Sequence, residues 1–259
     1  DLVAAEDTRY AGKLLAHHHI RASLISYHEH NESERAPDLA NRLRSGVSIA
    51  LLSNAGTPTI SDPGYTLIKA CIAYCIPVKP VPGVSAAITA LSVAGLATDA
   101  FVFEGFLPKK KAKRNKQLQS LAHESRTVVF YESPKRIEML LSEIKQMMGD
   151  RYCVLAREMT KTHEEFIRGS ASEILNRLRD RMAIKGECTL LVGASTASPS
   201  PPMAQIREAV RQSLSDGGRR LGDISKEIAK QFSVSKQLVY AEGLKIKKQI
   251  EPNRQDGVE

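Results

Sequence analysis

The order of apolar and polar positions along the chain predicts alternating strands and helices. Residues 47–52 (VSIALL) form a continuous apolar run of strand length. Residues 65–76 follow with an amphipathic helical pattern, and its apolar face consists of Leu67, Ile68, Cys71, Ile72 and Cys75. A further short strand is expected over residues 78–81 and a helix of small residues over 84–94. Strand, helix and strand at this spacing predict βαβ units and a mostly parallel sheet.

A second block of the same kind begins near residue 100, with strands expected over residues 126–131, 152–156 and 187–193. Ser133 and Pro134 are typical of a helix start, with Ser133 as N-cap, and Gly149 is typical of the end of that helix. Ser170 and Glu173 have the spacing of a capping box, which predicts a helix reaching about Met182.

The last part of the chain has a different composition. Residues 194–203 (ASTASPSPPM) predict a Ser/Pro linker. The residues beyond it have helical patterns, and Ile224, Ile228 and Ala229 followed by Val234 and Ser235 have the cadence of a helix-turn-helix, with Ser235 capping the second helix. A plain helical hairpin packed on the rest of the protein is the alternative. We therefore expect an N-terminal α/β domain over residues 1–100, a second α/β domain over 101–193, the linker, and a helical tail over 204–259.

Composition places the chain among ordinary globular proteins, because 42% of residues are apolar and 25% are charged. The chain opens inside an apolar run, residues 2–5, which is typical of the middle of a strand and predicts further residues upstream. The four cysteines lie in apolar runs without a CxxC pair, which predicts reduced, buried thiols in a cytoplasmic protein; they are Cys71, Cys75, Cys153 and Cys188. No run reaches the roughly 18 apolar residues of a membrane span, so no membrane partner is expected.

Charge adds one indication of a partner. The formal net charge is +8, from 37 Lys and Arg against 29 Asp and Glu. A basic balance favours a polyanionic partner, since phosphates attract Lys and Arg at long range. The densest basic run is KKKAKRNK over residues 109–116, for which a solvated face is the alternative interpretation.

Two loops have the composition of ligand sites. SNAGTPTISDPG (residues 53–64) directly follows the expected strand 47–52, and ligands of open α/β sheets bind at the carboxyl ends of strands. Its two Gly, two Pro, two Ser and one Asp predict a rigid loop that a ligand can approach closely, although a structured connector has a similar composition. PGVSAA (residues 82–87) lies between a strand and a helix start. Neither a Walker lysine nor a G-x-G-x-x-G occurs, so a triphosphate or standard dinucleotide site is unsupported.

Eight segments, taken in order, resemble a known family. They are AEDTR (5–9), HEHNE (28–32), SNAGTPTISDPG (53–64), PGVSAA (82–87), FEGFLP (103–108), FYESPKR (130–136), AREMTKTHEE (156–165) and KGECTLLV (185–192). Together they resemble the small-subunit ribosomal RNA cytidine 2′-O-methyltransferases, which belong to the tetrapyrrole methylase superfamily. The resemblance covers residues 1 to about 193 and, more weakly, the tail. It implies two α/β domains with S-adenosylmethionine in the cleft between them, a homodimer, and methylation of a ribose 2′-hydroxyl in small-subunit ribosomal RNA or the small ribosomal subunit.

The resemblance also implies site residues. Cofactor contacts carry over onto three segments, as Gly56, Thr57, Ile60, Ser61 and Asp62, then Ser85 and Ala86, then Tyr131 and Glu132. Together with the net charge, it favours RNA phosphate contacts in the basic run, at Lys109, Lys110, Lys111, Lys113 and Arg114. Two features depart from the family: Asn54 stands where the family has Asp, and the family's Thr-Pro-Ile-Gly-Asn loop, which helps to form the cleft, does not precede AEDTR here.

Methyl transfer from a sulfonium needs in-line approach of a nucleophile, so positioning is expected to supply much of the rate. A ribose hydroxyl is a weak nucleophile, which calls for a base or a polarising contact. Asp7 and Arg9, and likewise Glu158 and Lys161, follow expected strands and are catalytic candidates, with a structural ion pair or helix cap as the alternative for each. No metal is expected, because methyl transfer requires none and the sequence has no visible cluster of ligands. His17, His18 and His19 are successive residues that cannot share one helix face, and they are more typical of a solvated helix end. His28 and His30 fit either a substrate-facing loop or a surface turn.

Two other functions remain open on sequence alone. A methyltransferase acting on a tetrapyrrole or another small molecule would share the fold, but the basic run and the net charge of +8 argue against it. A non-enzymatic nucleic-acid-binding protein acting through its tail would not need two α/β domains with ligand loops at strand ends.

Overall fold

The computed structural model describes residues 1–195, 203–215, 219–232 and 234–250. The chain divides into two compact units, Asp1–Ser195 and Thr196–Glu259, which are described separately. Most of the predicted Ser/Pro linker, residues 196–202, lies outside the described residues.

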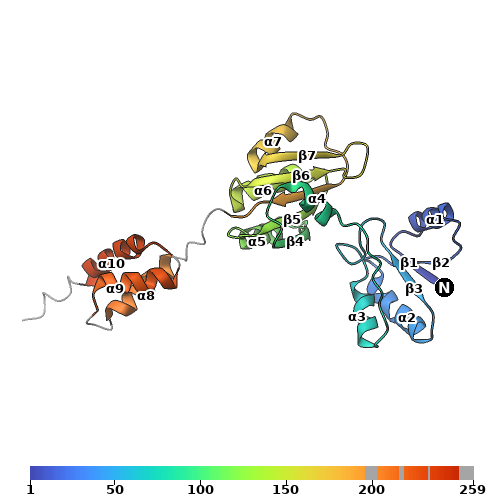
Figure 1. Cartoon of the computed structure of the whole chain (residues 1–259), viewed down its shortest axis with the longest axis horizontal. Coiled ribbons are helices and arrows are strands. Elements are labelled where there is room, and N and C mark those ends of the chain that lie inside the picture. Colours follow the sequence, from blue (N-terminus) through green and yellow to red (C-terminus); the bar gives the residue numbers. More distant parts are fainter. Residues whose placement is uncertain (196–202, 216–218, 233, 251–259) are drawn as a thin grey trace, which may run out of the picture. The chain divides into compact units, whose positions relative to one another are not determined.

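The first unit begins with a three-stranded parallel sheet of order β2-β1-β3 (Figure 1). β1 (Leu2–Ala5) pairs in parallel with β2 (Ser23–Ser26) and β3 (Ile49–Leu52), so the predicted strand in residues 47–52 and the parallel arrangement are confirmed here. The accompanying helices are α1 (Thr8–His17), α2 (Glu32–Arg44) and α3 (Tyr65–Ala73). Every residue of β1 is buried, and Tyr27, Leu39 and Leu67 form the core beside it. Central position in a parallel sheet explains the continuous apolar pattern of β1.

Residues 74–85 differ from the prediction in two ways. The strand expected over residues 78–81 is irregular backbone, and Val78 and Val81 are exposed. Pro77, Pro80 and Pro82 remove three backbone donors within six residues, which disfavours a ladder. Cys75 follows the end of α3 with a φ of 55° and is exposed, so the prediction that all four thiols are buried is wrong at this position. The small-residue helix is present as α4 (Ala86–Ala94).

The second sheet has five strands in the order β4-β5-β8-β6-β7. They are β4 (Phe101–Phe106), β5 (Thr127–Glu132), β6 (Tyr152–Arg157), β7 (Glu165–Ser170) and β8 (Cys188–Val192). Only β4 and β5 are parallel, while β5–β8, β8–β6 and β6–β7 are antiparallel. The prediction of a mostly parallel sheet is therefore wrong for this block. β8 lies between β5 and β6 and runs antiparallel to both of them. The sequence did not predict β7, because half of its residues are polar and it has no continuous apolar run.

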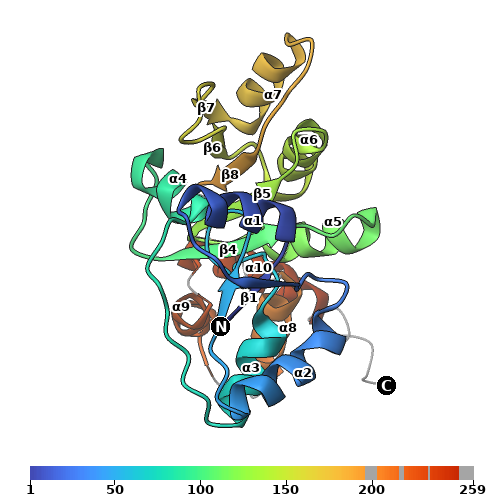
Figure 2. The same cartoon turned by 90° about the vertical axis from the view of Figure 1, so that its right-hand side faces the viewer.

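Alternate residues of this sheet face two different helical layers. Val128 and Phe130 of β5 contribute to a core with α5 (Lys111–Ser120), α6 (Ile137–Met148) and α7 (Ala171–Arg179), whereas Val129 contributes to a core with α4. Figure 2 shows α4 on one side of the strands and α5 and α6 on the other. Burial on both faces explains why β5, β6 and β8 have mostly apolar sequences.

The helix starts in this block agree with the predictions only in part. The capping box is confirmed, since Ser170 accepts a hydrogen bond from Glu173 N and the Glu173 side chain accepts one from Ser170 N. α7 ends at Arg179, before the predicted Met182. The predicted N-cap Ser133 is wrong, because α6 begins at Ile137. Residues 133–136 form a turn instead, in which Ser133 N donates to the Glu132 carboxylate and Arg136 forms an ion pair with the same group.

The described residues of the second unit form three helices, α8 (Met203–Ser215), α9 (Leu221–Gln231) and α10 (Lys236–Ile250). Its own core contains Ile206, Val210, Ile224, Ile228 and Val239. Ser235 Oγ accepts a hydrogen bond from Leu238 N at 3.2 Å, so the predicted cap of the last helix is confirmed. Within the described ranges, no helix is long and apolar enough to cross a membrane.

Candidate active site

One pocket of the first unit collects segments that are far apart in the sequence. Its volume is about 340 Å³, within the range of small-molecule sites. The wall comes from the β3–α3 loop, the start of α4, Phe106, the end of β5 and the residues around the start of β8. The lining residues are Ala55, Gly56, Thr57, Ile60, Ser61, Asp62, Ser85, Ala86, Phe106, Tyr131, Glu132, Ser133, Pro134, Gly186, Glu187, Cys188 and Thr189. All nine residues predicted to contact the cofactor are among them.

The β3–α3 loop is held in a strained conformation. Thr59 and Ser61 both have positive φ, at 74° and 65°, which is unfavourable for residues other than glycine. Thr57 Oγ1 donates a hydrogen bond to Val84 O at 3.0 Å and so ties this loop to the segment before α4. Gly105 of β4 has a φ of 60°, and a Cβ at this position would lie 2.7 Å from Ser61 Oγ in the loop. Backbone strain of this kind concentrates at functional sites, and here it shapes one wall of the pocket.

The end of β5 supplies two polar side chains. The Tyr131 hydroxyl accepts a hydrogen bond from Ala87 N at 3.0 Å, and its ring packs edge-on against Phe103 and Phe106. This contact occupies one backbone donor of the α4 start and leaves the Tyr131 O–H proton for another acceptor. Glu132 is buried, and its Oε2 lies 3.0 Å from Arg136 Nη2, although no hydrogen bond of good geometry reaches that oxygen.

The wall around the start of β8 contains residues that had not been predicted. In the antiparallel register, Cys188 lies opposite Glu132 and Thr189 opposite Tyr131. The amino end of β8 therefore meets the carboxyl end of β5, whereas a parallel sheet would place it at the far edge. The antiparallel direction depends on the whole sheet, so only the family motif KGECTLLV could have indicated this wall. Ala55, Ser133 and Pro134 were missed although each lies within two positions of a predicted site residue, and Phe106 was missed although it lies in the segment FEGFLP.

Asp62 is a partly buried carboxylate in the wall of the pocket. Burial raises the pKa of Asp62 to about 6, the nearby Glu6 carboxylate adds to this shift, and a hydrogen bond from Ser53 opposes it. Glu6 also accepts a hydrogen bond from Asn54 N at 2.9 Å. An aspartate in place of Asn54 would therefore add a third carboxylate to this corner, and Asn54 keeps the local negative charge lower.

The two candidate catalytic pairs form ion pairs outside the pocket lining. Asp7 caps α1 through Arg9 N at 2.8 Å and binds the Arg9 guanidinium at 2.6 Å, which lowers the pKa of Asp7 well below its usual range. These contacts support the structural alternative for both residues.

Glu158 lies closer to the pocket and orders part of its wall. Its Oε1 accepts from Lys161 Nζ and from Glu187 N, both at 2.9 Å, and the lysine bond lowers the pKa of Glu158. Gly186 has a φ of 89°, and a Cβ there would lie 2.2 Å from the Glu158 side chain. Glu158 and Lys161 thus hold the turn that carries Gly186 and Glu187, and only glycine fits at position 186.

The basic run divides into two kinds of residue. Lys109, Lys110, Lys111 and Lys113 are exposed around the start of α5. Arg114 is buried and binds both Glu143 carboxylate oxygens, at 2.6 and 2.8 Å, as well as the carbonyl oxygens of Pro108 and Lys109. The prediction that Arg114 contacts RNA phosphates is therefore wrong, because its donors are used inside the fold.

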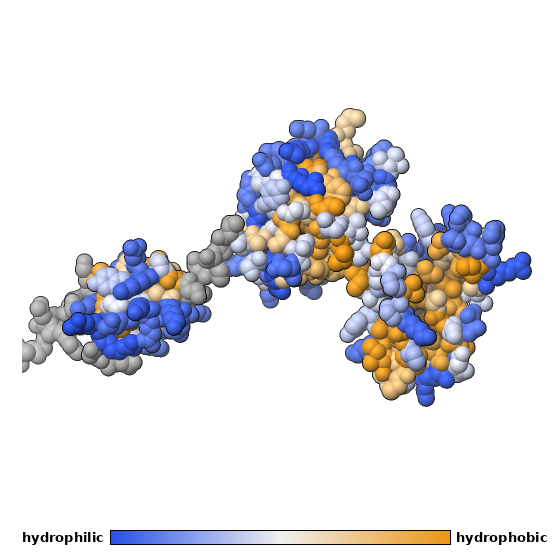
Figure 3. Space-filling model, in the orientation of Figure 1, coloured by the Kyte–Doolittle hydropathy of each residue, from blue (hydrophilic) through white to orange (hydrophobic). Residues whose placement is uncertain are grey.

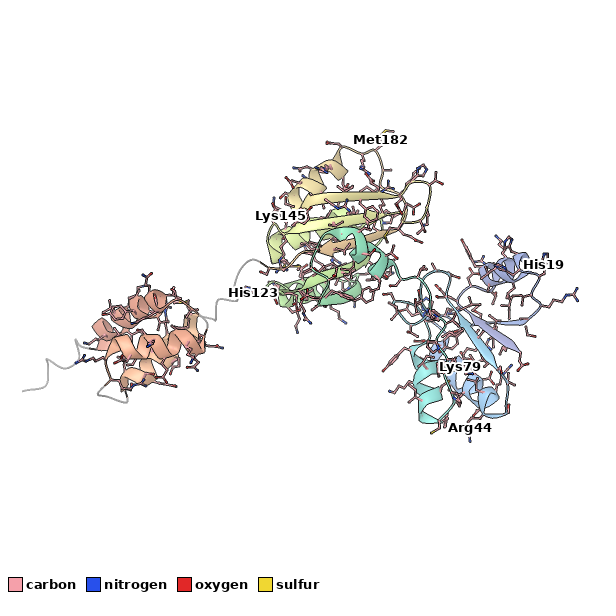
Figure 4. The ribbon with its side chains drawn as sticks, in the orientation of Figure 1. His19, Arg44, Lys79, His123, Lys145 and Met182 are labelled. Carbon is pink, nitrogen blue, oxygen red and sulfur yellow. The ribbon has the colours of Figure 1, made fainter. Side chains whose placement is uncertain are left out.

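The histidines lie away from the pocket. His17, His18 and His19 are exposed at the end of α1, and Figure 4 shows His19 at the surface. His28 N donates a hydrogen bond to Asn31 Oδ1 at 2.9 Å, which is typical of a turn before α2, and His30 is exposed. Among the residues with a described placement, no group of three His, Cys, Asp or Glu side chains could hold a metal ion.

Comparison with known proteins places this site in a family. Residues 1–175 match the profile of the tetrapyrrole (corrin/porphyrin) methylases. A protein of Synechocystis named ribosomal RNA small subunit methyltransferase I is 41% identical over 249 residues, covering 95% of this chain and 88% of that protein. The protein of the same name from Streptococcus pyogenes serotype M1 is 43% identical over 242 residues, covering 93% and 84%.

Solved structures agree on the fold. The methyltransferase CobJ has a TM-score of 0.51 at 18% identity, over 75% of this chain and 83% of that one. The uroporphyrin-III C-methyl transferase of Thermus thermophilus, solved in complex with S-adenyl homocysteine, has a TM-score of 0.50 at 15% identity, over 74% and 84%. At these identities the likeness concerns the fold alone, and it confirms the predicted fold class.

The fold and the sequence match together define the class of protein: the chain belongs to the tetrapyrrole methylase family. Within that family, the relatives from Synechocystis and Streptococcus pyogenes both have the name ribosomal RNA small subunit methyltransferase I. Their similarity extends over 95% and 93% of this chain, respectively. The resemblance drawn from the eight sequence segments is thereby confirmed.

Proposed function

We propose that this protein is an S-adenosylmethionine-dependent methyltransferase that methylates the ribose 2′-hydroxyl of a cytidine in small-subunit ribosomal RNA. The observation that carries the proposal is the pocket of about 340 Å³, whose wall includes all nine residues that the family resemblance assigns to the cofactor. The names of the relatives from Synechocystis and Streptococcus pyogenes support the choice of substrate.

The pocket residues fit a ligand with both polar and apolar parts. Gly56, Ala86 and Gly186 leave backbone accessible in the wall, and Phe106 offers an apolar surface. The Glu132 Oε2 atom is buried without a well-aligned donor, so a ligand hydroxyl or ammonium group would satisfy it. The Tyr131 hydroxyl, already an acceptor for Ala87 N, keeps its proton to donate to a ligand oxygen.

Bound S-adenosylmethionine supplies a methyl group activated by a positively charged sulfur. The chain has to orient the acceptor hydroxyl in line with that methyl group and to receive its proton. With a pKa of about 6, Asp62 is ionised at neutral pH and still close to the range in which a general base is efficient. We therefore assign the proton-accepting role to Asp62, and the role of holding residues 186–187 in the wall to Glu158 and Lys161.

RNA is attracted to the exposed basic residues before α5 and in its first turn. Lys109, Lys110, Lys111 and Lys113 form no ion pair among the described residues, so their charges can interact with phosphates. A target in a single-stranded or loosened region would let its ribose edge reach a pocket of this size. We further propose that the protein acts as a homodimer, as the family resemblance implies. We also propose that it acts in the cytoplasm, with which its four free thiols are consistent.

The first experiment is calorimetric titration of S-adenosylmethionine, made on this chain and on the same chain preceded by the family's first strand and Thr-Pro-Ile-Gly-Asn loop. Gly56→Ala tests the pocket and Gly95→Ala serves as its matched control. Both glycines have a φ near +70° and no atom closer than 4.0 Å to an added Cβ, but only Gly56 lines the pocket. Both variants should therefore lose similar stability, while only Gly56→Ala should weaken cofactor binding.

Failure of both chains to bind the cofactor would refute the assignment of the pocket. Transfer of a radioactive methyl group to small ribosomal subunits or to their naked RNA then tests the substrate. A 2′-O-methyl group protects the adjacent phosphodiester bond from alkaline cleavage, so the position of the protected bond identifies the modified ribose. Label recovered on a base, or on an added tetrapyrrole instead of RNA, would contradict the proposed reaction.

A further inference from the structure

The three-helix unit carries an exposed helix face that its own core does not use. The buried side of α10 contains Val239, Gly243 and Ile246, and the first and last of these belong to the core of the unit. The other side of α10 exposes Lys236, Gln237, Tyr240 and Leu244, which recur at helical spacing; we call these four residues the α10 face. Tyr240 and Leu244 are 41% and 42% exposed, so both side chains can contact a partner.

Basic residues outnumber acidic residues in this unit. Between residues 203 and 250 the sequence has ten Lys and Arg against five Asp and Glu. Glu242, the sole acidic residue of α10, is buried and binds Arg207 Nε at 2.8 Å and Lys245 Nζ at 2.6 Å. The outward side of α10 therefore presents cations, an amide, an aromatic ring and the side chains of Leu238 and Leu244, and no carboxylate. Figure 3 shows that the surface of this unit is largely hydrophilic.

The turn before α10 fixes the position of this face. Val234 N donates to Ala229 O at 3.0 Å, and the Ser235 cap accepts from Leu238 N, so the start of α10 is held against the end of α9. This is the helix–turn–helix arrangement in which the first residues of the second helix are presented to a nucleic acid. Lys236, Gln237 and Tyr240 occupy those positions here.

We propose that the α10 face is a second RNA-binding surface, by which the protein holds its ribosomal RNA substrate through residues other than those of the methyl-transfer pocket. Lys236 would contact a backbone phosphate. Tyr240 would stack on an unpaired base, because side chains cannot read the deep major groove of an RNA duplex and proteins instead recognise splayed bases by aromatic stacking. The inference rests on the proposed function for the identity of the RNA, but it uses none of the pocket residues.

The test compares full-length variants that differ only on this surface. Lys236→Glu should weaken binding of small-subunit ribosomal RNA and reduce the slope of log affinity against log salt by about 1 or more. Arg211→Glu is the control, since it makes the same charge change at an exposed position of α8. Tyr240→Ala should lower RNA affinity by about 5- to 100-fold through loss of stacking, whereas Tyr240→Phe should retain it.

Calorimetric titration of S-adenosylmethionine is made in parallel on every variant and should not change. In the methylation assay, Lys236→Glu and Tyr240→Ala should raise KM for RNA and leave kcat unchanged, as expected for a contact that binds RNA without taking part in the reaction. Equal RNA affinity of all four variants would overturn the proposal. So would a defect confined to intact ribosomal subunits with normal binding of naked RNA, since the face would then dock on protein. Loss of cofactor binding by the parent chain would instead refute the pocket, and the RNA affinities would still decide this proposal.

Discussion

Replacing Arg114 by methionine separates structural from RNA-binding residues within the basic run. The Arg114 side chain is 3% exposed, and it donates to both carboxylate oxygens of Glu143 and to the carbonyl oxygens of Pro108 and Lys109. Methionine keeps much of the apolar stem but leaves the Glu143 carboxylate, itself 9% exposed, without its cation. Removing one partner of a buried ion pair typically costs about 3 to 5 kcal/mol, because the remaining charge stays desolvated.

Urea unfolding followed by circular dichroism measures this loss. The transition of the first unit should move by about 3 to 5 kcal/mol for Arg114→Met and by less than about 0.5 kcal/mol for Lys113→Met, whose side chain is exposed. The double variant Arg114→Met with Glu143→Leu removes both charges together, and such replacements are often nearly neutral. It should therefore recover most of the stability that Arg114→Met loses.

RNA binding should show the opposite order. Lys113→Met is expected to weaken the affinity for small-subunit RNA. Folded Arg114→Met should retain this affinity, because the guanidinium of Arg114 in the parent protein has no free donor directed outward. A loss below about 1 kcal/mol for Arg114→Met, or a double variant that loses the sum of the two single changes, would refute the reasoning about the buried pair. An RNA defect in folded Arg114→Met as large as that of Lys113→Met would refute the division of the basic run.

Three further changes test other parts of the structure. Gly105→Ala should weaken S-adenosylmethionine binding in calorimetry, because its Cβ would displace Ser61, whereas Gly149→Ala, also at positive φ but with open space around it, should not. Asp62→Asn should abolish most of the methylation rate. The pKa of Asp62 is raised from 3.8 to about 6 in the folded state, so the fold is more stable when this side chain is protonated. That stability is fully present below pH 4 and is lost as the pH rises through 6, where the side chain ionises. The variant should therefore match the parent in stability near pH 4 and exceed it by about 1 to 2 kcal/mol at pH 8 in thermal unfolding, which is less than the full shift would give because solvent screens this partly exposed side chain. Equal stability at both pH values would contradict the assigned pKa. Ser170→Ala should cost about 1 kcal/mol in urea unfolding through loss of the capping box, and a neutral result would mean that the cap is replaced by solvent.

Much of the pocket follows from local sequence. SNAGTPTISDPG and PGVSAA could be expected to lie at ligand-accessible ends because each adjoins an apolar strand or a helix start, and glycine, proline and short polar side chains determine their backbone directly. The capping box at Ser170 and the cap at Ser235 were predictable for the same reason, since each depends on residues no more than three positions apart. Family resemblance then joined these loops into one site.

Tertiary structure alone decided which strands became neighbours and in which direction. An apolar run such as residues 188–192 satisfies a buried strand of either orientation, because its side chains are covered on both faces whichever way it runs. The insertion of β8 antiparallel to β5 brought Cys188 and Thr189 opposite Glu132 and Tyr131, and so completed the pocket. Arg114 likewise has the sequence environment of a surface cation, and only the packing of α5 on α6 turned it toward Glu143. Contacts of this kind join residues tens of positions apart, so the local pattern that predicts helices and strands contains no information about them.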